Sequence, residues 1–181
     1  MDQLLETAVR SVSAFGLADE MIEDEEAAAT ETLRSTLKTA QFLRQLRRHV
    51  AGDDANLRSR FNKRLKLGDA LPEVTIDYAF NEWMVQVTSL PATQKQSSNT
   101  IKESQSKLFE IELLRDAMLD TPLRPVLLVN EDILAHSPSD AARDEAARML
   151  DRLRKLTSSR SVDLIEAPTP ESAAKLVRAL A

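Results

Sequence analysis

The densest group of chemically active side chains in this sequence is a basic segment between residues 44 and 66. Eight bases stand there against two acids, a local net charge of +6: Arg44, Arg47, Arg48, Arg58, Arg60, Lys63, Arg64 and Lys66 against Asp53 and Asp54. Clustered cations neutralise phosphates, so the segment predicts salt-dependent nucleic-acid binding. The residues expected to carry it are Arg47, Arg48, Arg58, Arg60, Lys63 and Arg64. The alternative is a solvated face that pairs with acids of the same chain.

Several common reaction centres are missing from the sequence. It has no cysteine, and its two histidines, His49 and His136, lie far apart, which argues against a zinc site. Only three glycines occur, too few for a glycine-rich dinucleotide or phosphate loop. Zinc and dinucleotide chemistry are therefore not expected.

Two alternating runs between residues 73 and 90 predict a β-hairpin. The first run alternates at Val74, Ile76 and Tyr78, and the second at Trp83, Val85 and Val87. A period of two is typical of strands, and Asn81-Glu82 predicts a tight turn between them. The hairpin places Asp77 and Gln86 on neighbouring strands.

Helical spacing dominates the chain before the hairpin. Apolar residues predict a short helix over residues 2–15 and a long one whose stripe runs from Leu33 to Val50. Leu57, Phe61 and Leu65 predict a further helix within residues 56–66.

Helices and strands alternate after the hairpin. Residues 91–99 are polar and predict a mobile loop, and Asn99 or Thr100 is expected to cap a helix that ends near Leu119. Strands are predicted over residues 125–130 and 162–166, with helices beginning at Ser137-Pro138 and at Thr169. This βαβα order favours a parallel pair with a right-handed crossover.

The composition predicts one folded domain. A chain of 181 residues with 43% hydrophobic content can bury one sizeable core, so residues 1–28 are expected to form a helical extension and residues 29–181 a single α/β domain. No apolar run approaches the roughly 20 residues that span a bilayer. We expect no membrane partner and a cytoplasmic location.

The order of these elements resembles the core of the restriction-endonuclease-like superfamily, the PD-(D/E)XK nucleases. In that superfamily a helix precedes a β-meander, a second helix crosses over, and a further strand joins the sheet. The resemblance covers roughly residues 30–130. It implies a three-layer α/β core with a mixed sheet, preceded here by the helical extension and followed by the C-terminal βαβα segment.

The superfamily's sequence motif is incomplete in this chain. Asp77 matches its metal-binding aspartate, but the following strand reads Gln86-Val87-Thr88 where an acid, any residue and a lysine are expected. Mg²⁺ prefers anionic oxygen ligands, and a threonine cannot supply the cation that stabilises developing charge. The resemblance therefore implies a degenerate site at Asp77 and Gln86.

Some superfamily members supply the missing lysine from the following helix. Lys102 and Lys107 lie near the start of that helix here. Gln105 and Phe109 also resemble a glutamine-and-aromatic pattern of exonuclease-type relatives. The resemblance thus adds Lys102 and Lys107 as candidate catalytic residues.

Three functions stay open on the sequence. The first is a non-catalytic module that associates with DNA, RNA or a protein partner, in a phage or genome-defence setting, with no cofactor expected. The second is an active Mg²⁺-dependent nuclease in which Asp77 binds the metal and a lysine has migrated. The third is an interaction module whose N-terminal helices bind a protein partner or form a homodimer.

Overall fold

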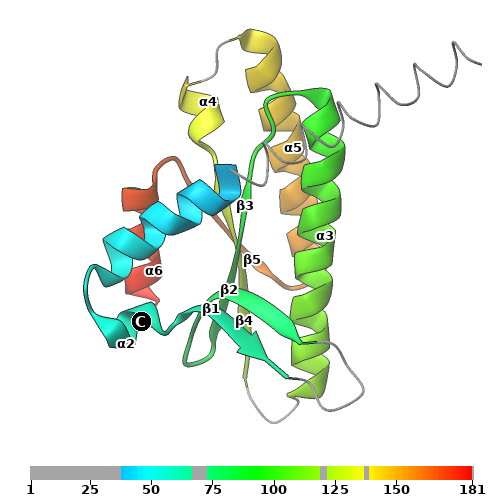
Figure 1. Cartoon of the computed structure of the whole chain (residues 1–181). Helices are drawn as coiled ribbons and strands as arrows, with labels where there is room; N and C mark the ends of the chain where they lie inside the picture. The colour runs from blue at the N-terminus through cyan, green and yellow to red at the C-terminus, as the bar shows by residue number, and fades with distance from the viewer. Residues whose placement is uncertain (1–37, 67–72, 119–121, 137–138, 181) are drawn as a thin grey trace, which may run out of the picture. The chain divides into compact units, whose positions relative to one another are not determined.

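The computed structural model describes residues 38–66, 73–118, 122–136 and 139–180. They form a mixed α/β fold around a five-stranded sheet whose strands follow chain order, β1-β2-β3-β4-β5 (Figure 1). The predicted N-terminal extension, residues 1–28, lies outside the described residues.

The sheet combines an antiparallel meander with two parallel strands. Its strands are β1 (Phe61–Leu65), β2 (Val74–Phe80), β3 (Trp83–Ser89), β4 (Arg124–Asn130) and β5 (Asp163–Ala167). β2 is antiparallel to β1 and β3, whereas β4 and β5 continue parallel to β3. The predicted turn at Asn81-Glu82 is confirmed, with Asn81 at a φ of 50°, a backbone region that asparagine tolerates. The predicted parallel pairing of the last two strands is confirmed as well.

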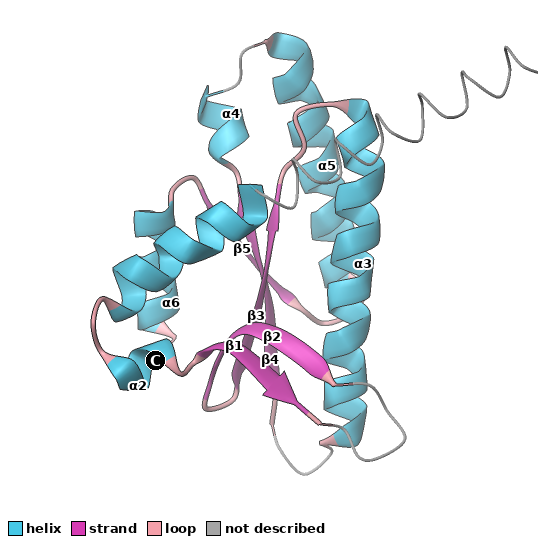
Figure 2. Cartoon of the chain, in the orientation of Figure 1, coloured by secondary structure: helices cyan, strands magenta, loops and turns pink. Residues whose placement is uncertain are grey.

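Helices pack on both faces of the sheet (Figure 2). They are a helix over residues 38–51, α2 (Ala55–Arg58), α3 (Gln94–Ala117), α4 (Asp132–His136), α5 (Asp140–Ser158) and α6 (Pro170–Ala179). The helix over residues 38–51 and α6 cover one face, and α3 and α5 cover the other. Within the described ranges, no helix is long and apolar enough to cross a membrane.

The interior strand β4, between β3 and β5, joins the two halves of the core. Val126 and Leu128 pack toward α6, while Leu127 and Val129 pack toward α3 and α5, and all four are fully buried. Burying one such side chain contributes about 1.5–3 kcal/mol. The prediction of a strand buried on both faces is therefore confirmed.

The predicted helix over residues 56–66 is wrong. The helix α2 ends at Arg58, and β1 then pairs with β2, Phe61 lying opposite Tyr78. Asn62 has a φ of 51°, which no right-handed helix contains. Phe61 and Leu65 contact opposite sides of the sheet, so their helical spacing does not mark one face.

Two predicted helix starts also need correction. α3 begins at Gln94, within the predicted loop, because Thr93 accepts a hydrogen bond from the Gln96 amide and Gln96 accepts one from the Ala92 amide. This reciprocal capping closes the first turn. α5 is capped by Ser139, and residues 137–138 lie outside the described part.

Candidate functional site

The hairpin and α3 bring three of the four predicted catalytic residues together. Asp77 on β2, Gln86 on β3 and Lys107 on α3 lie in one cluster, where the Lys107 ammonium is 3.2 Å from a carboxylate oxygen of Asp77. Lys102 is exposed, and none of the described contacts joins it to this cluster. Five residues along a helix correspond to a rotation of about 140°, so the two lysines cannot face the sheet together.

The cluster lies where β2 and β3 separate. Their backbone pairing ends at Tyr78 and Val85, and beyond it side chains take over the hydrogen bonds. Asp77 Oδ2 accepts from the Val87 amide at 2.7 Å, and Gln86 Nε2 donates to the Thr75 carbonyl at 2.9 Å. Unpaired backbone groups are costly when buried, so these two side chains have a structural role here.

The alternation of β2 breaks at this same point. Val74 and Ile76 pack on the α3 side, but Tyr78 packs on the opposite side. The regular alternation predicted through Tyr78 is therefore wrong at Asp77, whose carboxylate also reaches Lys107 of α3. A break of this kind re-aims side chains near the point where pairing ends.

Three oxygens surround the Lys107 ammonium. It donates to Asp77 and to the Val87 carbonyl, and it forms an ion pair with Glu103 at 3.2 Å. The Lys107 and Asp77 side chains are only 17% and 13% exposed. The cationic position among these oxygens is thus filled by the chain itself.

Gln86 connects the cluster to a second carboxylate. Its Nε2 lies 3.3 Å from Glu110 Oε2, while its buried Oε1 has no hydrogen-bond partner among the described residues. Burial raises the pKa of Glu110; the positive charge of Lys107 opposes this effect and the negative charge of Asp77 adds to it. Glu103, Lys107 and Glu110 are four and three residues apart and therefore lie on one face of α3. A search for apolar stripes does not reveal this face because its residues are charged.

We expect Glu110→Gln to stabilise the protein at neutral pH. The folded pKa of Glu110 lies above its ordinary value of 4.5, so the folded state binds more protons between the two values. The free energy of unfolding therefore falls as the pH rises from the ordinary pKa of 4.5 through the raised pKa. Glutamine cannot ionise, so the variant does not show this loss of stability. Its amide oxygen still accepts a hydrogen bond from Gln86. Urea unfolding at several pH values measures it, with exposed Asp116→Asn as the control. A Glu110→Gln variant that is less stable at neutral pH would contradict the expectation.

Small polar residues fill the space beside the cluster. Thr88 stands where the superfamily's lysine is expected, is completely buried, and accepts from Ser104 Oγ at 3.3 Å. Thr100, which lies on α3 with Ser104, is 1% exposed. α3 thus packs directly on the strand that would carry the motif.

The cluster does not fit Mg²⁺ as it is built. Among the residues that the structure describes, no group of three or more histidine, cysteine or acidic side chains is arranged to hold a metal ion. Gln86 adds no charge, and the Lys107 ammonium already satisfies the Asp77 and Glu103 carboxylates. A divalent ion needs several oxygen ligands free of such a competing cation.

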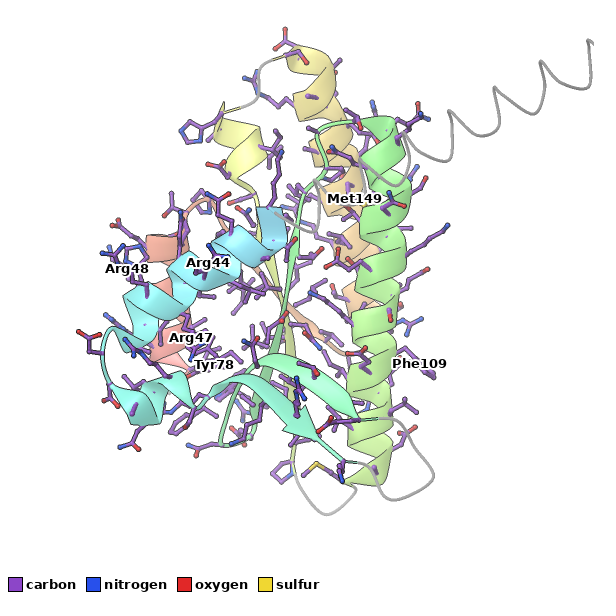
Figure 3. All side chains as sticks on the ribbon, viewed as in Figure 1. Arg44, Arg47, Arg48, Tyr78, Phe109 and Met149 are labelled. Atoms are coloured by element: carbon purple, nitrogen blue, oxygen red, sulfur yellow. The ribbon has the colours of Figure 1, made fainter. Side chains whose placement is uncertain are left out.

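The residue pattern Gln105 and Phe109 points away from the cluster. Gln105 is exposed, and Phe109 is 56% exposed on the outer side of α3 (Figure 3). The pattern therefore takes no part in the arrangement around Asp77.

The predicted nucleic-acid-binding residues lie on other elements than the cluster. Arg47, Arg48 and Arg58 line one recess together with Arg44 and Gly52. Arg60 stacks over the Phe80 ring at 3.4 Å, and Lys63 and Arg64 are exposed on β1. The helix over residues 38–51 covers the sheet face opposite α3, so the arginines of that helix and the Asp77 cluster are on opposite faces.

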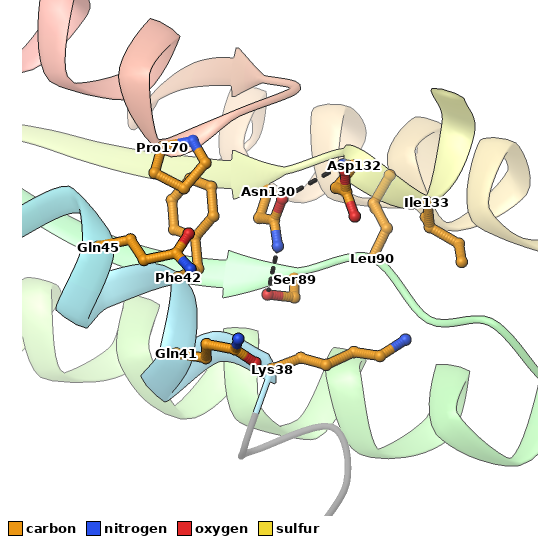
Figure 4. A pocket seen from close by; sticks show the side chains of 10 residues that line it. All are labelled: Lys38, Gln41, Phe42, Gln45, Ser89, Leu90, Asn130, Asp132, Ile133 and Pro170. Atoms are coloured by element: carbon orange, nitrogen blue, oxygen red, sulfur yellow. Dashed lines mark hydrogen bonds between the residues drawn. The ribbon is translucent and has the colours of Figure 1, made fainter. Parts of the chain in front are cut away.

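A further recess of about 350 Å³ lies at the carboxyl ends of β3 and β4 (Figure 4). Ser89 and Asn130 end these strands and are joined by a hydrogen bond of 3.2 Å. Ligands of α/β proteins often bind at this edge of parallel strands. None of the predicted site residues lines this recess. A polar residue at the end of each of two strands is the feature of the sequence that could have located it.

No family model, curated protein or solved structure matches the chain.

Proposed function

We propose that this chain contains a restriction-endonuclease-like domain whose catalytic set is degenerate and which acts as a non-catalytic nucleic-acid-associated module. The observation that carries the proposal is the Lys107 ammonium between Asp77, Glu103 and the Val87 carbonyl. The ammonium already contacts the oxygens that a metal ion bound at Asp77 would need.

The element order supports the fold assignment. The helix over residues 38–51 precedes the meander β1-β2-β3, α3 crosses over, and β4 joins beside β3 in parallel. Helices lie on both faces of this mixed sheet. This element order and the mixed sheet support the fold part of the proposal.

The charge distribution supports association with nucleic acid. Basic side chains from the helix over residues 38–51, α2 and β1 are exposed although the whole chain has a net charge of −5. Local positive charge on an acidic protein attracts phosphates and gives binding that weakens as salt rises. DNA and RNA both present this chemistry.

The nucleic-acid-binding part of the proposal predicts that reversing two charges on β1 lowers the affinity for DNA or RNA. We expect Lys63→Glu with Arg64→Glu to weaken binding of DNA or RNA and to reduce the slope of log K against log salt by about 0.7–0.9 for each phosphate that is no longer neutralised. Fluorescence anisotropy over a salt series measures both quantities. Arg152→Glu, exposed on α5, is the matched control. Unchanged binding in the β1 variant would count against nucleic-acid association through this strand.

An active nuclease is the second candidate, and one observation favours it. Lys107 lies 3.2 Å from Asp77, as a migrated lysine would need to. We expect no cleavage of DNA or RNA by the wild-type protein with Mg²⁺ or Mn²⁺. Cleavage that is lost in Asp77→Ala would replace the proposal by this second candidate.

Residues 1–28, on which the expected protein partner or homodimer depends, lie outside the described residues. A protein-interaction role for that extension therefore stays a prediction.

A further inference from the structure

Four arginines surround a single recess of about 360 Å³. Arg44, Arg47 and Arg48 project from the helix over residues 38–51, and Arg58 comes from α2. Arg47 and Arg48 follow Arg44 by three and four residues, a spacing that places both of them beside Arg44 on one side of the helix. Figure 3 shows the three on this helix. We call this feature the arginine recess.

The recess is short of negative charge. Asp53 pairs with Arg58 at 2.7 Å, but Arg44, Arg47 and Arg48 form no ion pair with any described residue. Arg58 is also held by the Gly52 carbonyl at 2.8 Å, so its guanidinium is fixed at the rim. A Cβ on Gly52 would meet no atom within 4 Å, which leaves the backbone open at this point.

The helix macrodipole does not account for the arrangement. Cations near a helix C-terminus are favourable, but that end carries only about half a negative charge. One arginine is enough to balance it, and Arg58 already binds the carbonyl of Gly52. The remaining positive charge can be neutralised by an anion with more than one charge.

A second recess of about 260 Å³ shares Arg44 and Arg47 with the first. Its other lining residues include Leu43, Phe61 and Asn62. A cationic recess that shares two lining residues with a partly apolar one matches the two parts of a nucleotide, a phosphate and a nucleoside. Phosphate monoesters carry about 1.5–2 negative charges near neutral pH, more than the single charge of a backbone diester.

We infer that the arginine recess binds the terminal phosphate of a nucleic-acid strand, with the terminal nucleoside in the recess beside Phe61. This inference rests on the proposed function and makes it more specific. Arg44 and Arg47 contact both parts of the terminal nucleotide, whereas Arg48 and Arg58 contact the phosphate alone.

The test compares oligonucleotides that differ only at their ends. Short single-stranded DNA and RNA are titrated with a 5′-phosphate, a 3′-phosphate or hydroxyls at both ends. We expect a terminal phosphate at one end to raise affinity about tenfold, since charge-assisted bidentate hydrogen bonds are strong. In Arg48→Gln this preference should disappear, whereas Lys63→Glu with Arg64→Glu should weaken the binding of phosphate-ended and hydroxyl-ended strands alike and keep the preference. Arg152→Gln should keep the preference, and circular dichroism checks that each variant is folded.

The outcomes separate this inference from the proposed function. Binding with no preference for a terminal phosphate overturns the inference and leaves nucleic-acid association standing. Binding of inorganic phosphate without any oligonucleotide binding overturns both. Residues 19–31 form an acidic run of seven acids and no base. The titration is repeated with these seven acids changed to amides. A preference that appears only in that variant would show that the acidic run is the ligand of the recess in the intact chain, which also overturns the inference.

Discussion

Lys107→Met is expected to destabilise the protein by about 3 kcal/mol, because breaking a largely buried ion pair leaves its partner unpaired. The substitution keeps an aliphatic stem of similar length but removes the ammonium that contacts Asp77, Glu103 and the Val87 carbonyl. Two carboxylates and a carbonyl then face one another without a cation. Urea or guanidinium unfolding, monitored by circular dichroism, measures the loss.

Two further variants make this expectation specific. Lys102→Met lies on the same helix but is exposed, and surface changes of this kind cost within about 0.5 kcal/mol. Asp77→Asn combined with Lys107→Met should cost less than the sum of the single changes, because the two groups interact directly. Equal effects of Lys102→Met and Lys107→Met would show that the ammonium does not stabilise the strand separation.

Local signals were sufficient for part of this fold. The turn at Asn81-Glu82, the buried strand β4 and the capped start of α6 depend on residues close together in sequence, and all three predictions are confirmed. β1 could not be predicted in this way. Its residues have helical spacing, and only pairing with β2 makes them a strand.

The candidate site shows the same limit. The hairpin predicted from the sequence already places Asp77 and Gln86 on neighbouring strands. Which of Lys102 and Lys107 reaches Asp77 depends on how α3 is rotated against the sheet, which the sequence does not show. Glu110 was missed, although it follows Glu103 and Lys107 on one helical face. The first half of α3 buries polar residues such as Ser97 and Ser104, and a search for apolar stripes does not find them because their burial depends on partners in other elements.

Introducing a lysine at Thr88, where the resemblance to the superfamily implies one, should cost more stability than any change above. Thr88 is completely buried under α3, so Thr88→Lys must insert a longer side chain and an ammonium into filled space. Overpacking alone costs about 1–3 kcal/mol, and a buried unpaired charge adds several more. We expect a loss above about 4 kcal/mol, a large share of the roughly 5–15 kcal/mol that stabilises a typical domain. Chemical denaturation measures this loss, and a variant that does not fold agrees with it.

Thr88→Val is the matched control, since it keeps the shape and removes the hydroxyl that accepts from Ser104. Its expected cost is about 1 kcal/mol, the typical net value of one hydrogen bond. The difference between the two variants isolates the lysine from the loss of the hydroxyl. A Thr88→Lys protein as stable as wild type would mean that α3 leaves room for a catalytic lysine. If that variant also cleaved DNA or RNA with Mg²⁺, a lysine at position 88 would be sufficient for cleavage even with Gln86 in place of the acid.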